Sequence, residues 1–384
     1  MANAHTTDEL KQMQSLPLEA KILMTRQRIK AWYESWTRFE IHNDKTGKTR
    51  FVTMDTREFG TEPALKDGEW IVSAFPGAVY VSFSGGKDST VLKHIVDSMY
   101  TDVPALFVNT GLEYPEIQRF AMAQKNVITV RPEMRFDEVL KKYGYPIVSK
   151  DVAKCVFYAR RTDETNVHYK KLFGLMQHNG KKSRFCCDNW QFLYDAPFET
   201  SSWCCDVMKK KPAHAYEAQT GRKPIIGTMA QESNLRYQSW IKNGCNAFNG
   251  KKPKSQPMSF WTEQDVLHYI KKYNVPICSV YGDIVLDDSA EIDGQINLID
   301  YLGAHEETDR LKTTGCDRTG CIFCCFGCHL EKSPNRFQRL KETHPRQYQY
   351  CIGGGEYTED GKWQPSKEGL GIGKVLDYIG VKYD

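Results

Sequence analysis

The segment VYVSFSGGKDSTVLKHIV, residues 79–96, begins with β-branched and aromatic residues and ends with apolar residues at helical spacing. This pattern predicts a buried strand followed directly by a helix. The connection between them contains two serines, two glycines, a lysine and an aspartate. Because ligands of doubly wound sheets bind beyond the carboxyl ends of the strands, this connection is a candidate binding site.

The connection has the composition of an oxyanion-binding loop. A helix that begins there offers unpaired backbone N–H groups and the positive end of its dipole. Gly85 and Gly86 allow the backbone to approach a ligand closely. Ser84 and Ser89 add hydroxyl donors, and Lys87 adds a positive charge. The spacing Gly-x4-Gly-Lys-Ser/Thr of the Walker-type loop is absent, so the sequence predicts a different class of phosphate loop.

Strand and helix patterns alternate along the rest of the central region. Expected strands cover residues 78–83, 104–111, 126–132 and 223–230, and expected helices cover residues 89–100, 113–125, 136–144 and 262–274. Thr262 and Asp265 are predicted to cap the last of these helices. Strands that alternate with helices indicate an α/β fold with a doubly wound parallel sheet and crossover helices.

The regions on either side of this pattern divide the chain into three expected segments. Residues 1–76 are predicted to hold an amphipathic helix, with Leu18, Ile22, Ile29 and Trp32 on its apolar face, followed by an excursion of short strands and turns. The helix is expected to pack on the main domain, and a partner-binding role is the alternative. Residues 77–280 form the expected nucleotide-binding domain, in which residues 151–203 read as an irregular insertion, and residues 281–384 form a cysteine-rich region.

Composition excludes several classes of protein. The chain is 40% hydrophobic and 26% charged, it has no apolar run long enough to span a bilayer, and its first residues lack the layout of a signal peptide. We therefore expect a cytoplasmic protein without membrane contact. Its thirteen cysteines form an odd set, which favours metal ligands or reactive thiols over a disulfide framework. Clustered lysines indicate either solvated loops or a surface for a polyanion such as nucleic acid.

The loop SGGKDS after a strand resembles the pyrophosphate loop of the ATP pyrophosphatase (PP-loop) superfamily. Four other segments resemble the phosphoadenylyl-sulfate (PAPS) reductase family: NTGLEYPE (residues 109–116), WCCDVMKKKP (203–212), GTMAQESNLR (227–236) and WTEQDVLHYIKKYNVPICSVYGD (261–283). The resemblance implies a Rossmann-like fold of the adenine nucleotide alpha hydrolase type. It implies nucleotide contacts from Ser84, Gly85, Gly86, Lys87, Asp88, Ser89, Thr110, Gly111, Gly227 and Ser233. It also implies catalytic roles for Lys87, Asp88, Cys204 and Arg236.

Two departures from the reductase pattern count against sulfonucleotide reduction. No cysteine follows Cys351, where sulfate-reducing members carry a nucleophilic cysteine in the tail, and Gly227 is followed by Thr228 instead of an arginine. The remaining motifs resemble the Dnd- and Ssp-type sulfurtransferases of DNA phosphorothioation. The expected function is therefore ATP-dependent sulfur transfer, in which an acceptor oxygen is adenylated, pyrophosphate leaves and sulfur replaces the oxygen. The alternatives are a PAPS or adenylyl-sulfate reductase that produces sulfite, a tRNA thiolation enzyme, and a nucleotide-binding regulatory protein.

The segment GCDRTGCIFCCFGCHLE, residues 315–331, has the spacing of a multi-thiolate site. The resemblance implies a [4Fe–4S] cluster, and Zn²⁺ is the alternative metal because zinc sites also use C-x2-C. Two ligand sets stay open. Cluster-bearing assimilatory reductases use a tandem pair plus C-x2-C, which corresponds to Cys204, Cys205, Cys321 and Cys324; the phosphorothioation branch resembles Cys316, Cys321, Cys324 and Cys328.

The same resemblance implies the remaining cofactors and partners. ATP is expected with Mg²⁺ shared by Asp88, and a cysteine desulfurase is expected as the sulfur donor. The expected acceptor is nucleic acid, with DNA favoured over tRNA, and a homodimer is a further expectation. If Cys204 is not a cluster ligand, it is the candidate thiol that carries sulfur, because Lys209 nearby favours a thiolate. Cys186 and Cys187 match neither ligand pattern.

Overall fold

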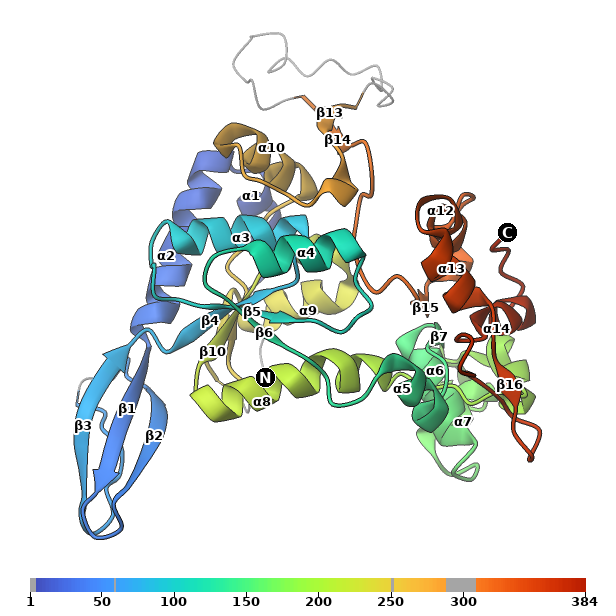
Figure 1. Cartoon of the computed structure of the whole chain (residues 1–384), viewed down its shortest axis with the longest axis horizontal. Coiled ribbons are helices and arrows are strands. Elements are labelled where there is room, and N and C mark those ends of the chain that lie inside the picture. The colour runs from blue at the N-terminus through green and yellow to red at the C-terminus, as the bar shows by residue number, and fades with distance from the viewer. Residues whose placement is uncertain (1–4, 59, 250–251, 288–308) are drawn as a thin grey trace. The chain divides into compact units, whose positions relative to one another are not determined.

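The computed structural model describes residues 5–58, 60–249, 252–287 and 309–384 (Figure 1). The chain forms two compact units. The first unit contains Met1–Val108, Tyr114–Val130 and Ala213–Thr319, and the second contains Asn109–Glu113, Arg131–Pro212 and Gly320–Asp384. In the described part of the chain, no helix is both long enough and apolar enough to cross a membrane. The three consecutive segments expected from the sequence remain a prediction, since the two units are defined by packing and are not consecutive.

The first unit is built on a six-stranded sheet. The strand order is β11-β12-β10-β4-β5-β6, and among these strands every pairing is parallel except that of β11 with β12. The strands are β4 (Val79–Phe83), β5 (Ala105–Val108), β6 (Val127–Val130), β10 (Lys223–Ile226), β11 (Asn246–Ala247) and β12 (Lys254–Ser255). The doubly wound parallel sheet is thereby confirmed. The order reverses between β4 and β10, and that switch point is where such folds bind ligands.

Helices pack around this sheet and bury its apolar side chains. They are α1 (Thr7–Gln14), α2 (Leu18–Glu34), α3 (Lys87–Asp97), α4 (Pro115–Ala123), α8 (Lys211–Thr220), α9 (Asn234–Asn243) and α10 (Glu263–Tyr273). In α2 the predicted apolar face is confirmed, because Ile29 and Trp32 are completely buried. The Lys21 ammonium on α2 donates to both carboxylate oxygens of Asp265 at 2.8 and 2.7 Å, which ties α2 to α10. Thr262 and Asp265 form the predicted capping box.

The expected excursion of strands and turns is an antiparallel sheet, which we call the β wing (residues 36–76). Its strands are β1 (Trp36–Asn43), β2 (Lys48–Asp55) and β3 (Glu69–Pro76), in the order β2-β1-β3. Figure 1 shows the wing as an elongated extension of the first unit, next to the carboxyl end of α2. The first unit also contains the hairpin of β13 (Ile284–Leu286) and β14 (Leu311–Thr313) and two 3-10 turns, Ala230–Glu232 and Ser279–Tyr281.

The second unit is mainly helical. It contains α5 (Phe136–Tyr143), α6 (Lys150–Ala159), α7 (Val167–Leu172), α12 (Arg336–Thr343), α13 (Pro345–Ile352) and α14 (Ile372–Tyr378). Short two-stranded sheets pair β7 (Ile147–Val148) with β15 (Cys325–Phe326), β8 (Gln177–His178) with β9 (Lys181–Lys182), and β16 (Glu356–Tyr357) with β17 (Trp363–Gln364). A 3-10 helix (Asp188–Asp195), a 3-10 turn (Cys328–Leu330) and a π-helical turn (Asp206–Lys210) complete it.

The expectation of irregular structure over residues 151–203 is wrong for much of that range. Helix α6 fills its first part because Val152, Cys155 and Val156 recur at helical spacing and are buried. The Ser149 hydroxyl accepts a hydrogen bond from the Val152 backbone N–H at 3.1 Å, which caps this helix. The polar and aromatic residues that obscured this pattern lie on the surrounding turns and in α7.

Candidate functional site

The phosphate loop, residues 84–89, connects β4 to α3 as predicted. Gly85 has a φ of +74°, and a Cβ atom there would lie 2.9 Å from Cγ2 of Ile117, so both conformation and space favour glycine. The Ser84 and Ser89 hydroxyls are 3.0 Å apart, and the Ser89 hydroxyl also donates to the Gly86 carbonyl at 2.9 Å. These bonds hold the loop in a tight turn at the amino end of α3, a position that favours an anion. In this structure the backbone N–H groups of Ser84 and Gly86 donate to hydroxyls of the loop itself.

Protein groups bind Lys87 in this structure. Its backbone N–H donates to the Tyr281 hydroxyl at 3.1 Å, and its ammonium donates to the Asp317 carbonyl at 2.5 Å. The same ammonium lies 3.0 Å from Oε1 of Glu263, and the Lys87 residue is only 3% exposed. The Tyr281 hydroxyl is bonded in turn to the Thr319 hydroxyl at 2.7 Å. A phosphate that enters the loop therefore has to replace contacts from residues 317–319, which we call the covering segment.

Charged side chains surround Asp88 at the same end of the sheet. Burial raises the pKa of the Asp88 carboxyl, although the positive charges of Lys87, Arg318 and Arg236 act to lower it. Its Oδ1 atom is buried and has no hydrogen-bond partner. Glu232 forms ion pairs with Arg236 and, at 3.6 Å, with Arg318. Charges of both signs around a buried, unpaired carboxylate oxygen are typical of functional sites.

The other predicted nucleotide contacts fall in different places. Gly227 follows β10, and a Cβ atom there would lie 3.1 Å from the Asp88 carbonyl oxygen, so glycine permits the close approach of β10 to α3. Ser233 caps α9, since its hydroxyl accepts from the Arg236 backbone N–H at 3.3 Å. Thr110 and Gly111 belong to the second unit, where the Thr110 hydroxyl donates to Oε1 of Glu113 at 2.8 Å.

The second unit contains a cavity lined by four cysteines. Cys204 and Cys205 come directly before the π-helical turn, a distortion that recurs at functional sites, and their sulfur atoms are 3.9 Å apart. Cys321 and Cys324 lie in one turn, in which the Cys324 N–H donates to the Cys321 carbonyl at 3.1 Å. The complete lining is Leu112, Phe136, Pro146, Cys204, Cys205, Met208, Lys209, Cys321 and Cys324. The structure thus brings together the tandem pair and the C-x2-C pair.

The four thiols do not ionise equally. A hydrogen bond from Cys204, aided by the positive charges of Lys150 and Lys209, lowers the pKa of Cys205 to about 6 despite its burial. The same hydrogen bond, with burial, raises the pKa of Cys204. Burial raises the pKa of Cys321 to about 11, although the Lys209 ammonium acts to lower it, and burial also raises the pKa of Cys324. Four thiolates in this cavity therefore require added positive charge, which a bound metal group supplies.

Four cysteine thiols around one cavity have the chemistry of a thiolate-bound metal group, such as an iron–sulfur cluster. Among the described residues, no three His, Cys, Asp or Glu side chains are arranged to hold one metal ion. A cluster of several irons separates its thiolate ligands more widely than one ion does, and cysteine thiolates are the usual ligands of such clusters. The four cysteines and the apolar side chains of Leu112 and Phe136 around them suit that larger group.

The remaining cysteines of the alternative ligand set lie outside this lining. Cys316 belongs to the first unit and directly precedes the covering segment. The buried Cys328 thiol donates to the Cys325 carbonyl at 3.0 Å. Cys155 and Cys187, which matched no pattern, lie together in the second unit, where the Cys155 sulfur is 3.7 Å from Nδ1 of His168. The choice between the two ligand sets stays a prediction. The cavity favours the set of Cys204, Cys205, Cys321 and Cys324, because these are the cysteines that line it.

Several residues of the site were not predicted. Tyr281, Glu263, Asp317 and Arg318 all contact or act on the phosphate loop, but they are 170 or more positions away from it in the sequence. The sequence contained a signal for two of them. Asp317 and Arg318 lie between Cys316 and Cys321, but the prediction for this segment considered only its cysteines.

Comparison with known proteins places this geometry in a family. The family model described as "Phosphoadenosine phosphosulfate reductase domain" matches residues 78–172 and 159–326, which together make up more than half of the chain. The chain belongs to this family. The matched region includes the phosphate loop, both cysteine pairs of the cavity and the covering segment. The narrower resemblance to the DNA phosphorothioation branch is a proposal only.

Relatives of this family match shorter stretches of the chain. An adenosine 5′-phosphosulfate reductase of Lysinibacillus sphaericus is 29% identical over 126 residues, which are 29% of this chain and 52% of that protein. A phosphoadenosine 5′-phosphosulfate reductase of Alkalilimnicola ehrlichii is 31% identical over 64 residues, 17% of this chain and 26% of that protein. An uncharacterized protein of Methanocaldococcus jannaschii is 34% identical over 82 residues, 20% of each chain. The matches therefore span at most about half of these relatives.

Proposed function

We propose that this family member is an adenylyl-sulfate or PAPS reductase that holds a [4Fe–4S] cluster on Cys204, Cys205, Cys321 and Cys324. The observation that carries the proposal is the cavity in which the tandem pair meets the C-x2-C pair. That set resembles the ligands of cluster-bearing assimilatory reductases, and two relatives are named as sulfonucleotide reductases. The comparisons thus favour sulfonucleotide reduction, which the sequence analysis gave as an alternative to ATP-dependent sulfur transfer.

The residues of the first unit have clear tasks in this reaction. The phosphate loop and Lys87 bind the phosphate of the sulfonucleotide, and Arg236 and Arg318 supply positive charge near it. A thiolate then attacks the sulfur atom, the bond from sulfur to the phosphate oxygen breaks, and the nucleotide leaves with the electron pair. A second thiol from thioredoxin attacks the resulting thiosulfonate, which releases sulfite and leaves a disulfide. When bound, the cluster supplies positive charge in the second unit.

Cys316 is our candidate for the attacking thiol. Of the three described cysteines in the first unit, Cys245 and Cys278 are buried, whereas Cys316 is half-buried. Cys316 is followed directly by Asp317, whose carbonyl accepts the hydrogen bond from Lys87. A thiol at this position directly precedes the covering segment, whose contact with Lys87 a bound sulfonucleotide has to replace.

The experiment is sulfite release under anaerobic conditions. The purified chain, with its iron intact, is mixed with adenylyl sulfate or PAPS and reduced thioredoxin. Sulfite and the matching nucleotide should form in equal amounts. Lys87→Ala should slow the reaction by tenfold or more, while Lys93→Ala, on the same helix, serves as the matched lysine control. No sulfite from either substrate, with the iron present, would contradict the proposal.

ATP-dependent sulfur transfer is the second candidate, and Asp88 favours it. The buried, unpartnered Oδ1 atom of Asp88 beside Lys87 suits a Mg²⁺ ion bound to a pyrophosphate, because Mg²⁺ prefers carboxylate and phosphate oxygens. Such an enzyme would release AMP and pyrophosphate from ATP only with a nucleic acid acceptor and a cysteine desulfurase as sulfur source. Measuring pyrophosphate with and without single-stranded DNA or tRNA separates this activity from the reductase. A chain that forms neither product but binds nucleotide would be a regulatory protein.

A further inference from the structure

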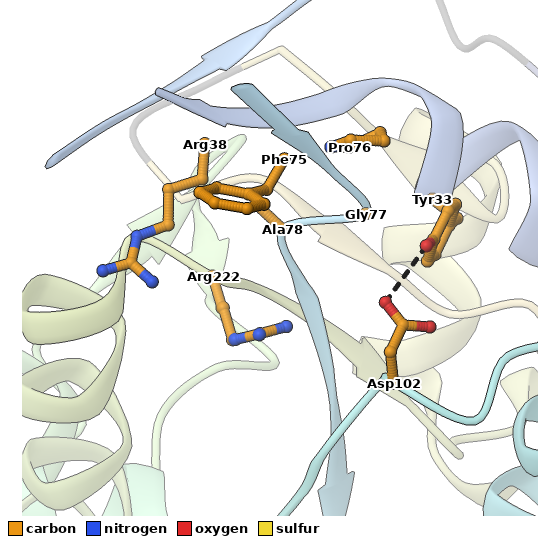
Figure 2. Close-up of a pocket in the computed structure, with 8 residues that line it drawn as sticks. All are labelled: Tyr33, Arg38, Phe75, Pro76, Gly77, Ala78, Asp102 and Arg222. Atoms are coloured by element: carbon orange, nitrogen blue, oxygen red, sulfur yellow. Dashed lines mark hydrogen bonds between the residues drawn. The ribbon is translucent and has the colours of Figure 1, made fainter. Parts of the chain in front are cut away.

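A pocket lies at the base of the β wing, apart from the phosphate loop. Figure 2 shows its lining, which is drawn from α2, from the end of the wing and from the two loops before β5 and β10: Tyr33, Arg38, Phe75, Pro76, Gly77, Ala78, Asp102 and Arg222. Gly77 has a φ of +73° where the chain leaves the wing for β4. All of these residues belong to the first unit. The reaction steps proposed above assign no role to the residues of this pocket.

The pocket lining has two guanidinium groups, those of Arg38 and Arg222, and one carboxylate, that of Asp102. Among the described residues, neither Arg38 nor Arg222 forms an ion pair, and Nε of Arg38 is buried without a hydrogen-bond partner. Arg222 donates only one described side-chain bond, to the Val79 carbonyl at 2.9 Å. The carboxylate of Asp102 accepts from the Tyr33 hydroxyl at 3.1 Å, and Figure 2 shows this pair on the other side of the pocket from the two guanidinium groups. Two guanidinium groups with free donors are suited to a phosphate.

Three other cations of the wing are paired within the wing itself, whereas Lys48 and Lys66 form no ion pair among the described residues. Ion pairs join Lys45 to Asp67, Arg50 to Glu69, and Arg57 to Asp55. Arg38 and Arg222 are the two cations that face the pocket at the base of the wing. A ligand that the wing binds through charge should place its anionic group there.

Exposed aromatic side chains continue from the pocket along the same face of the wing. In the strand register Phe75 lies opposite Arg38, Phe51 lies opposite Glu40, and Trp70 lies opposite His42. Residues directly opposite each other, and alternate residues of one strand, share a face of the sheet, so the three aromatic rings lie on one face. They are 52%, 48% and 46% exposed. The Arg38 guanidinium lies 3.8 Å from the centre of the Phe51 ring, which links the row of rings to the pocket.

We propose that this face of the wing binds single-stranded nucleic acid, with a backbone phosphate between Arg38 and Arg222 and bases stacked on Phe75 and on the rings beyond it. Proteins that bind single strands combine a positive site for the backbone with aromatic side chains on which bases stack. The pocket supplies the first feature and the row of rings supplies the second. A free mononucleotide would satisfy the arginines but would leave Phe51 and Trp70 unused.

Fluorescence anisotropy of the full chain with a labelled single-stranded DNA of about 12 nucleotides tests the proposal. Arg222→Gln and Arg38→Gln should each weaken binding about tenfold and reduce the salt dependence by about one phosphate contact. Phe75→Leu should weaken binding several-fold with little change in salt dependence. Lys48→Gln removes the same charge from the opposite face of β2 and should leave the affinity unchanged. Melting temperatures of all variants show whether the wing stays folded.

Three outcomes of the single-strand and AMP titrations would overturn the proposal. They are no binding by the wild-type chain at low salt, an equal loss in Lys48→Gln and Arg222→Gln, and AMP binding as tight as that of the oligonucleotide. Equal affinity for a duplex of the same sequence would remove the stacking part of the proposal and also contradict it. Because binding is measured without a reaction, these results are independent of sulfite or pyrophosphate formation, which Arg222→Gln should leave unchanged with small nucleotide substrates.

Discussion

Lys87 is nearly buried, yet its ammonium group is bonded to groups that a phosphate can replace. The Asp317 carbonyl offers the Lys87 ammonium a partial negative charge, and the Glu263 carboxylate offers it a full negative charge. A nucleotide phosphate carries more negative charge and also bonds to the backbone N–H groups of the loop. The exchange keeps the ammonium paired at every stage, so that no unpaired buried charge is formed. We therefore expect Lys87 to contribute to nucleotide binding, and in this structure it holds the covering segment through the Asp317 carbonyl.

Lys87→Ala should weaken binding of ATP and of adenylyl sulfate at least tenfold, which corresponds to about 1.4 kcal/mol. The reason is the loss of a positive charge at the amino end of α3. Isothermal titration calorimetry measures the affinity, with Lys93→Ala as the control on the same helix. Unchanged affinity in Lys87→Ala would show that the phosphate binds elsewhere.

Tyr281→Phe should strengthen nucleotide binding by a few-fold. The Tyr281 hydroxyl occupies the Lys87 backbone N–H and holds Thr319, so its removal weakens a contact that competes with phosphate. The apoprotein should lose about 1 kcal/mol of unfolding free energy with that hydrogen bond. The same titration and a denaturant melt measure both effects. Weaker nucleotide binding would mean that Tyr281 is part of the binding site and does not compete with it.

Cys316→Ser should abolish sulfite formation while the iron content stays at the wild-type level. The variant removes the candidate nucleophile, but Cys316 does not line the four-cysteine cavity. Cys278→Ser, a change at a buried cysteine of the same unit, is the control and should retain activity. Loss of iron in Cys316→Ser would instead support the alternative ligand set of the C-terminal loop.

At the scale of elements, the local sequence pattern predicted a site correctly where one strand and the helix that follows it form that site. The loop of residues 84–89 was predicted because β4, the glycines and α3 are consecutive in the sequence. The cysteine cavity was predicted only as two competing sets, since the tandem pair before the π-helical turn and the Cys321–Cys324 turn are more than a hundred residues apart. Only tertiary packing decides which thiols converge. Helix α6 was missed because the polar and aromatic residues of the surrounding turns obscured the helical spacing of its buried residues.

Cys204→Ser and Cys324→Ser should each abolish the broad absorbance at about 400 nm that is expected of the anaerobically purified protein. Each change removes one thiolate from the cavity, and a hydroxyl does not replace it as an iron ligand. Cys351→Ser, at a buried cysteine outside the cavity, should keep the absorbance. Iron and zinc analysis of the same samples supplies the control for the metal. Stoichiometric zinc without iron would contradict the cluster.

At the scale of the whole molecule, the chain passes repeatedly between two units, and each unit has its own chemical centre. The class of the sheet could be predicted, because alternating strands and helices determine it. The pattern of crossings could not be predicted, since the segments 109–113 and 131–212 leave the first unit at points with no change in composition. The phosphate loop and the covering segment belong to the first unit, and the cavity belongs to the second. The covering segment ends at Thr319, and the cavity cysteine Cys321 follows two positions later. The two centres are therefore connected directly through the chain.

Hydrogen exchange should separate the two centres. Bound adenylyl sulfate should slow exchange in α3, at residues 279–281 and in the 84–89 loop, because binding of the folded form suppresses local opening of the unit that holds the ligand. Removal of iron with a chelator should speed exchange at residues 203–210 and 321–324, because the four thiols of the cavity lose their compensating charge. We expect bound nucleotide to speed exchange in the covering segment, since the phosphate replaces the Asp317 carbonyl as a partner of the Lys87 ammonium. Slower exchange there would mean that the nucleotide binds without displacing residues 317–319, and that the contacts of Lys87 with Asp317 and Glu263 belong to the bound state.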